Sequence, residues 1–247
     1  MRRLALSIVL ILSGCPKRHV DAAAEAMAAA LGAVDRAWVG RDAGGLDAVA
    51  SALDDVPDQT SPEVAWRRAR LGVARGIMAP DARMQRRDFA DARGAAMSCV
   101  LSAPTLSHAW EIQRDADAIH DLPYDRLGCA AWAGYAWSRW LSTLEPGAGA
   151  VDVPAVLALL DRGAAEPEKE RLEITVWGRA IVEAVQGSPS KLLLDAHRRD
   201  DDDAWVWWAD VQRWLPSASG LLIPDRGPRA PEERVAYARL SETTDKP

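Results

Sequence analysis

Apolar residues recur along most of the chain at spacings of three and four, the period of an α-helix that buries one face. No stretch alternates β-branched residues in the way that predicts a strand. Gly, Pro and Asp interrupt the apolar pattern and divide it into helices of ordinary length. Helices are predicted at about residues 20–40, 46–56, 61–79, 82–101, 106–120, 124–144, 153–164, 167–186, 191–198, 200–215 and 231–240.

The clearest helix start is Ser61-Pro62-Glu63. Serine can cap the first turn, proline suits the first helical position, and glutamate favours the positive end of the helix dipole. The turn Ala79-Pro80-Asp81 then joins this helix to a partner of similar length, which predicts an antiparallel helical hairpin. The two expected apolar faces are Trp66, Ala69, Val73 and Ile77, and Phe89, Ala92, Ala96 and Val100.

The segment 124–144 carries apolar residues around most of its circumference, which predicts a helix buried on several sides. A break at 146–149 separates it from a partner helix at 153–164. The three apolar faces of the 124–144 helix are Tyr124, Gly128, Ala131 and Tyr135; Cys129, Trp132, Ala136 and Trp140; and Ala130, Ala133, Trp137 and Leu141.

The unit of helix, short turn and helix recurs at about 61–101, 124–164 and 167–198, with an imperfect period. Helix pairs that repeat at this length are typical of helical solenoids. We therefore expect an all-α fold of stacked antiparallel helical hairpins, a tetratricopeptide-like α-solenoid or bundle. The helical domain is expected to span residues 20–240, followed by a flexible tail at 241–247.

The first residues have the organisation of an export signal. A basic start, Met1-Arg2-Arg3, precedes an apolar run from Leu4 to Leu12 that is too short to span a bilayer permanently. The following Leu12-Ser13-Gly14-Cys15 resembles the bacterial lipobox. The resemblance implies removal of residues 1–14, lipidation of Cys15, and a lipid-anchored linker at 15–19. The alternatives are an ordinary secretory signal with a chance cysteine, or a buried N-terminal helix.

Pro16 and Lys17 follow the lipobox, so the aspartate that retains Gram-negative lipoproteins in the inner membrane is missing. By this resemblance we expect a protein anchored in the outer membrane and facing the periplasm. The formal net charge of -6 argues against a nucleic-acid partner, which needs a basic face.

The remaining cysteines, Cys99 and Cys129, could form a disulfide in an oxidising compartment, or could be two buried free thiols. A catalytic pair of either thiol with His108 or His120 lacks any surrounding motif. The four histidines show no metal-ligand spacing and no glycine loop could cradle a phosphate, so neither catalysis, a metal nor a cofactor is expected.

Three charged clusters are interpreted as solvated helix surfaces, although each could bind an ion or a partner of opposite charge. The acidic cluster is the run Asp200 to Asp203. The basic clusters are Arg67-Arg68 with Arg70, and Arg86-Arg87.

The lipobox, the hairpin at 61–101, the block Cys129-Ala130-Ala131-Trp132-Ala133-Gly134-Tyr135-Ala136-Trp137 and the hairpin after it together resemble the periplasmic T-component lipoprotein of TRAP-type transporters. This resemblance covers about residues 20–215. It implies a tetratricopeptide-like helical fold and a periplasmic solute-binding protein as partner. The Gly-Gly-Pro-His-like segment of that family is not recognisable near Gln186-Gly187-Ser188-Pro189.

Three functions are compatible with this sequence. The first is a lipid-anchored, non-enzymatic scaffold that binds a protein partner, as an accessory to a TRAP-type uptake system. The second is a periplasmic carrier of a hydrophobic small molecule or lipid, and the third is an envelope hydrolase. The chain has eleven Trp but one Phe, and tryptophan serves both cores and apolar cavities. The residues expected to line an apolar cavity are Trp132, Trp137 and Trp140.

Overall fold

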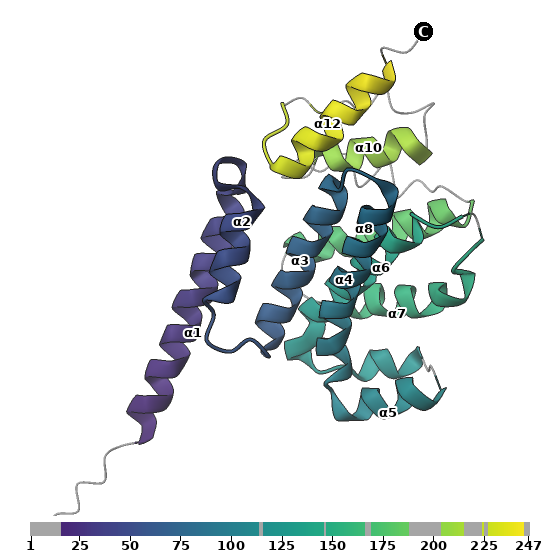
Figure 1. Cartoon of the computed structure of the whole chain (residues 1–247). Helices are drawn as coiled ribbons and strands as arrows, with labels where there is room; N and C mark the ends of the chain where they lie inside the picture. Colours follow the sequence, from purple (N-terminus) through teal and green to yellow (C-terminus); the bar gives the residue numbers. More distant parts are fainter. Residues whose placement is uncertain are drawn as a thin grey trace, which may run out of the picture.

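The computed structural model describes residues 16–113, 116–145, 147–165, 169–187, 204–214, 224 and 227–244. Ten α-helices and three short 3-10 helices make up this part of the chain, which contains no strand (Figure 1). The α-helices are α1 (Pro16–Val39), α2 (Arg41–Asp54), α3 (Pro62–Met78), α4 (Ala82–Leu101), α5 (Pro104–Gln113), α6 (Leu127–Leu141), α7 (Val153–Gly163), α8 (Lys169–Val185), α10 (Ala204–Trp214) and α12 (Pro231–Thr244). The 3-10 helices are η1 (Asp117–Asp121), η2 (Tyr124–Arg126) and η3 (Ala150–Asp152).

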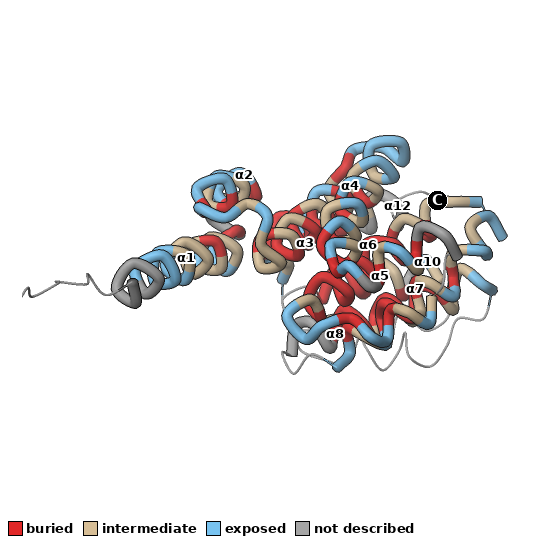
Figure 2. The backbone as a smooth tube through the Cα atoms, turned by 90° about the horizontal axis from the view of Figure 1, so that it is seen from below, coloured by how far each residue is buried: buried red, intermediate tan, exposed pale blue. Residues whose placement is uncertain are grey.

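Helix α6 lies at the centre of the fold and contacts α3, α4, α7 and α8. Figure 2 shows the buried residues gathered in these helices. Every residue of α6 except Trp140 is buried, so the prediction of a helix covered on several sides is confirmed. Small residues allow this close packing, because a Cβ on Gly134 would lie only 2.8 Å from the Leu160 side chain of α7.

The hairpin α3–α4 begins where the sequence predicts. Ser61 Oγ accepts a hydrogen bond from the Val64 amide at 3.4 Å and caps α3, while Asp81 caps α4 through the Met84 amide at 2.8 Å. The predicted face of α4 is buried throughout, and that of α3 is buried except for Ile77, which packs against the core while partly exposed. Apolar burial therefore holds this pair against α6.

The N-terminal hairpin α1–α2 packs beside α3 (Figures 1 and 2). Arg70 of α3 lies between two indole rings, 4.2 Å from the centroid of Trp38 and 5.1 Å from that of Trp66. Arg67 stacks 4.0 Å from Trp66 and pairs with Asp35 of α1 at 2.6 Å. These stacked cations and the ion pair join α1 to α3.

The prediction of a solvated surface is wrong for Arg67 and Arg70, because both side chains are buried. Their burial is stabilised by the Asp35 carboxylate and by the indole faces that cover them. The local sequence does not show this burial, because the carboxylate partner, Asp35, lies more than 30 residues away on another helix. Arg68 does stay closer to solvent, where it donates hydrogen bonds to Gln59.

The C-terminal helices α10 and α12 pack on each other, and α12 also contacts α2 and α3. Glu233 is fully buried and accepts hydrogen bonds from the Trp205 amide of α10 at 3.2 Å and from the Arg229 amide at 2.9 Å. Its neighbour Glu232 forms a buried ion pair with Arg41 of α2 at 2.7 Å. The first turn of α12 thus binds both α10 and α2.

Several predicted boundaries change. α1 begins at Pro16, so residues 16–19 of the predicted linker are helical. The helix expected at 106–120 divides into α5 and η1, and the break expected at Gly44-Gly45 is a kink inside α2, where Gly45 has φ 70°. α12 continues to Thr244 into the expected tail. The signal segment 1–14, Cys15, the expected helix 191–198 and the acidic run 200–203 lie outside the described residues.

Candidate functional site

A disulfide joins the last turn of α4 to the first turn of α6. Cys99 and Cys129 are both buried, with their Cα atoms 6.1 Å apart. In this bridged state neither sulfur is a thiolate, and His108 and His120 are exposed. Structural disulfides persist in oxidising compartments, so this bond points to an extracytoplasmic location. None of the helices in the described part is long and apolar enough to cross a membrane.

The largest described cleft lies between α4, α5, α6 and the η3–α7 segment, with a volume of about 750 Å³. Most of its wall is apolar, and Val151, 87% exposed, stands at its edge. The lining residues come from five separate stretches of chain: Arg93, Gly94, Met97, Leu101, Trp110, Ala116, Trp137, Val151, Asp152, Pro154 and Ala155.

Two tryptophans form the aromatic wall of this cleft. Trp110 of α5 meets Trp137 of α6 edge to face, with ring centroids 6.2 Å apart. Arg93 of α4 lies over two rings at once, 4.9 Å from the centroid of Trp137 and 4.8 Å from that of Trp140. The cation is therefore held in place by indole faces and not by a carboxylate.

The cleft contains two opposite charges, Arg93 and Asp152, that do not pair with each other. Neither side chain has a hydrogen bond or ion pair among the described residues. Burial lowers the pKa of Arg93, while the negative charge of Asp152 acts in the opposite direction. An arginine stays protonated at neutral pH in any such environment, so the positive charge of Arg93 is present in the cleft.

The turn after α6 places Asp152 at the cleft. Gly149 has φ 85°, in the left-handed region that favours glycine. Its carbonyl accepts a hydrogen bond from the Asp152 amide at 2.9 Å, and this bond forms the first turn of η3. A Cβ at Gly149 would lie 2.5 Å from the Leu141 side chain. Glycine is therefore required here by both the backbone conformation and the packing.

The structure separates the three tryptophans that the sequence analysis grouped. Trp137 lines the cleft, and partly buried Trp140 contacts the cleft through Arg93. Trp132 lies in the core beside Tyr135, with ring centroids 5.8 Å apart, and lines none of the described cavities. Sequence reasoning missed Arg93, Trp110 and Asp152 because nothing in their local pattern shows that they meet.

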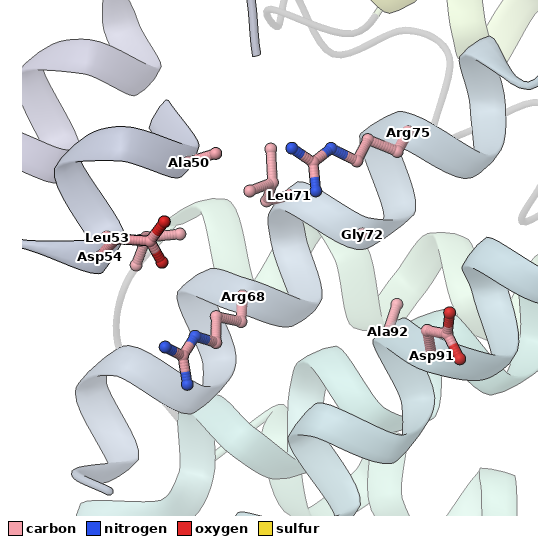
Figure 3. Close-up of a pocket in the computed structure, with 9 residues that line it drawn as sticks. All are labelled: Ala50, Leu53, Asp54, Arg68, Leu71, Gly72, Arg75, Asp91 and Ala92. Atoms are coloured by element: carbon pink, nitrogen blue, oxygen red, sulfur yellow. The ribbon is translucent and has the colours of Figure 1, made fainter. Parts of the chain in front are cut away.

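A second cavity, of about 350 Å³, lies between α2, α3 and α4. Figure 3 shows Asp54 on α2, Arg68 and Arg75 on α3, and Asp91 on α4 around it. Three of these charges already have partners: Arg68 donates to Gln59, Arg75 lies 3.9 Å from Asp47, and Asp91 lies 3.7 Å from Arg87. Surface pairs of this kind leave no strong demand for a ligand.

A third cavity, of about 230 Å³, is bordered by a buried polar network on α6 and α10. Arg139 donates to Asp210 at 2.6 Å and to the Tyr135 hydroxyl at 2.8 Å, and the Trp177 indole donates to Asp210 at 3.0 Å. Burial alone would lower the pKa of Arg139, but the charge of Asp210 and the contact with Tyr135 raise it overall. We interpret this satisfied network as structural.

Comparison of the chain with family models, curated proteins and solved structures finds no match. Within the described ranges, no three His, Cys, Asp or Glu side chains are close enough to hold a metal ion. The cleft lined by Trp110 and Trp137 is therefore the candidate site, on the strength of its size, its apolar wall and its two unpaired charges.

Proposed function

We propose that this protein is a lipid-anchored binding protein of the bacterial cell envelope that holds an apolar small molecule in the cleft between α4, α5, α6 and α7. The single observation that carries the proposal is the volume of about 750 Å³ bounded by Trp110, Trp137 and aliphatic side chains. Small-molecule sites are typically concave, largely apolar and between about 300 and 1,000 Å³. A ligand there would remove apolar surface from water on several sides.

Two further features support the proposed location. The Cys99–Cys129 disulfide fits an oxidising compartment. The lipobox-like Leu12-Ser13-Gly14-Cys15 supplies an attachment point immediately before α1, and the residues after it favour the outer membrane. The protein would then be tethered by its N-terminus, with the helical body in the periplasm.

Mass spectrometry of the extracted ligand tests the function. Gly94 of α4 lines the cleft, and a Cβ added there has no atom within 4 Å, so the ring of Gly94→Phe is introduced at the cleft to take up part of its volume. Arg87→Phe adds the same side chain at an exposed position on the same helix and is the control. We expect the protein purified from membranes to carry an apolar compound that Gly94→Phe loses and Arg87→Phe retains. Absence of such a compound from the unmodified protein, or its retention by Gly94→Phe, would contradict the proposal.

A protein-binding scaffold is the second candidate, and the surroundings of α6 favour it. This helix contacts both members of the preceding hairpin, α3 and α4, and the two helices that follow, α7 and α8. Stacked helical hairpins with such contacts build the extended binding surfaces of solenoid proteins. The partner to test is a periplasmic solute-binding protein of a TRAP-type system. Crosslinking in the periplasm should capture it, and a loss of capture in Gly94→Phe would show that the cleft itself is the docking site.

A further inference from the structure

Building on the proposed function, we propose that the cleft selects an apolar zwitterion. In this arrangement Arg93 binds the anionic group of the ligand and Asp152 binds its ammonium group. The apolar body lies against Trp110 and Trp137. The inference rests on the presence of two opposite, unpaired charges in one apolar cleft.

Arg93 is organised in advance for an anion. Its guanidinium is partly buried and lies over Trp137 and Trp140, so its position is fixed and part of its hydration is already lost. Stacking occupies the faces of a guanidinium and leaves the N–H groups at its edge available for hydrogen bonds. Among the described residues none of these donors has an acceptor. A carboxylate or phosphate oxygen of a ligand would supply one, with the strength of a charge-assisted hydrogen bond.

Asp152 explains why a simple anion does not suit this cleft. Its carboxylate is partly buried in the same cleft, at the end of η3, and would repel a second negative charge. Both residues line the cleft, but they form no ion pair with each other within 4.0 Å, so each charge is available to a ligand group. A ligand with its own ammonium and anionic groups satisfies both residues, whereas an anion or an amine satisfies one and is repelled by the other.

The chemistry of the ligand follows from these charges together with the wall. A ligand that satisfies both residues carries an ammonium group and an anionic group together with an apolar chain or ring. Apolar amino acids or peptide ends have this chemistry, and so do zwitterionic lysolipids. The open cleft of about 750 Å³ accommodates the apolar part of either source.

Matched ten-carbon probes separate the contributions of the charges. The full-length protein is placed in phosphatidylglycerol nanodiscs, whose lipid carries no ammonium group, and binding is measured by isothermal titration calorimetry with 2-aminodecanoate, decanoate and decylamine. The same tail in all three keeps the apolar term constant. We expect 2-aminodecanoate to bind at least about tenfold more tightly than either singly charged probe, because both of its charged groups make hydrogen bonds in the cleft. Decanoyl lysophosphatidylethanolamine, compared with 2-aminodecanoate, identifies whether the site prefers a lipid or an amino-acid headgroup.

Substitutions at the two charges should have complementary effects. Arg93→Gln should weaken 2-aminodecanoate and decanoate by about tenfold or more and not weaken decylamine. Asp152→Asn should weaken 2-aminodecanoate and decylamine but strengthen decanoate, because the repulsion is removed. Arg87→Gln, at an exposed arginine on the same helix, is the control and should change none of the affinities. Thermal unfolding of each variant checks that the fold is retained, and Asp152→Asn tests the inference even if loss of the Arg93 stacking destabilises α4.

The outcomes distinguish this inference from the function on which it rests. If decanoate binds as tightly as 2-aminodecanoate and Asp152→Asn has no effect, the zwitterion is wrong while an apolar cleft remains. If decylamine binds best, the assignment of Arg93 as the anion-binding group is wrong. If no probe binds and the purified protein carries no compound, the small-molecule function itself fails.

Discussion

Breaking the Cys99–Cys129 bridge should lower the free energy of unfolding by about 3.5 kcal/mol. The bridge spans 30 residues of sequence, and the loss of chain entropy in the unfolded state for a loop of that size is about 12 cal/mol/K, or about 3.5 kcal/mol at 25 °C. Both cysteines are buried, so Cys99→Ala with Cys129→Ala also removes two sulfur atoms from the core and adds about 1 kcal/mol of lost packing. Reduction keeps the sulfur atoms, and its effect should therefore be the smaller of the two.

Urea unfolding followed by near-ultraviolet circular dichroism measures both effects. The full-length protein in mild detergent is compared with and without reductant, and the double alanine variant is measured under both conditions. Reductant should lower the midpoint for the unmodified protein and leave the variant unchanged. The slope with urea should rise when the bridge is broken, because the unfolded chain then exposes more surface.

A change of less than about 1 kcal/mol on reduction would refute this reasoning, as would an equal effect of reductant on the double alanine variant. Either result would mean that the bridge does not restrain the unfolded chain of the native protein. The same measurement bears on location, because a bond that contributes this much stability requires a compartment in which it stays oxidised.

Further changes have opposite expected signs. Gly94→Ala should raise the free energy of unfolding by about 0.5–1 kcal/mol, because the added Cβ meets no atom within 4 Å and alanine favours a helix. Gly163→Ala should lower it by about 2 kcal/mol, because its Cβ would lie 2.5 Å from the backbone of Ala131; urea unfolding measures both. Asp210→Asn should cost about 3 kcal/mol by leaving the Arg139 cation buried without its carboxylate, seen as a lower melting temperature, and an unchanged melting temperature would contradict this. Burial would raise the pKa of Asp35, but its arginine partners lower it below 3.8, so its stabilisation is present above that pH and lost as the pH falls further. Asp35→Asn should therefore reduce the loss of unfolding free energy below about pH 4, by less than about 1 kcal/mol because the side chain is half exposed. Urea unfolding at a series of pH values measures this, and the same loss in the unmodified protein and the variant would contradict the assignment.

The local features of the fold could be predicted where one signal dominated. The start of α3 combined a capping serine, a proline and an acidic residue, and the structure has the helix at that place. The apolar circumference of the segment around Trp132 indicated a central helix, as α6 is. The segment 106–120 was harder, because its apolar spacing is weak and does not distinguish an α-helix that stops at Gln113 from one that continues.

The candidate site depends on proximity that no local pattern encodes. Arg93, Trp110 and Asp152 come from three segments that meet only after α4, α5 and η3 pack around α6. Periodicity could place Trp137 on an apolar face, but not show that this face borders a cleft. The burial of Arg67 was missed for the same reason, since its carboxylate partner lies on α1.

The ion pair between Arg41 and Glu232 joins positions separated by 191 residues. In the proposed export from the N-terminus, the arginine reaches the new compartment long before the glutamate arrives. The α1–α2 hairpin can complete its docking only after α12 has folded, because a buried cation without its counter-ion is unfavourable. With the proposed lipid anchor, the segment nearest the membrane would be delivered first and secured last, and a chain truncated before α12 would leave α1 and α2 less firmly attached to the rest.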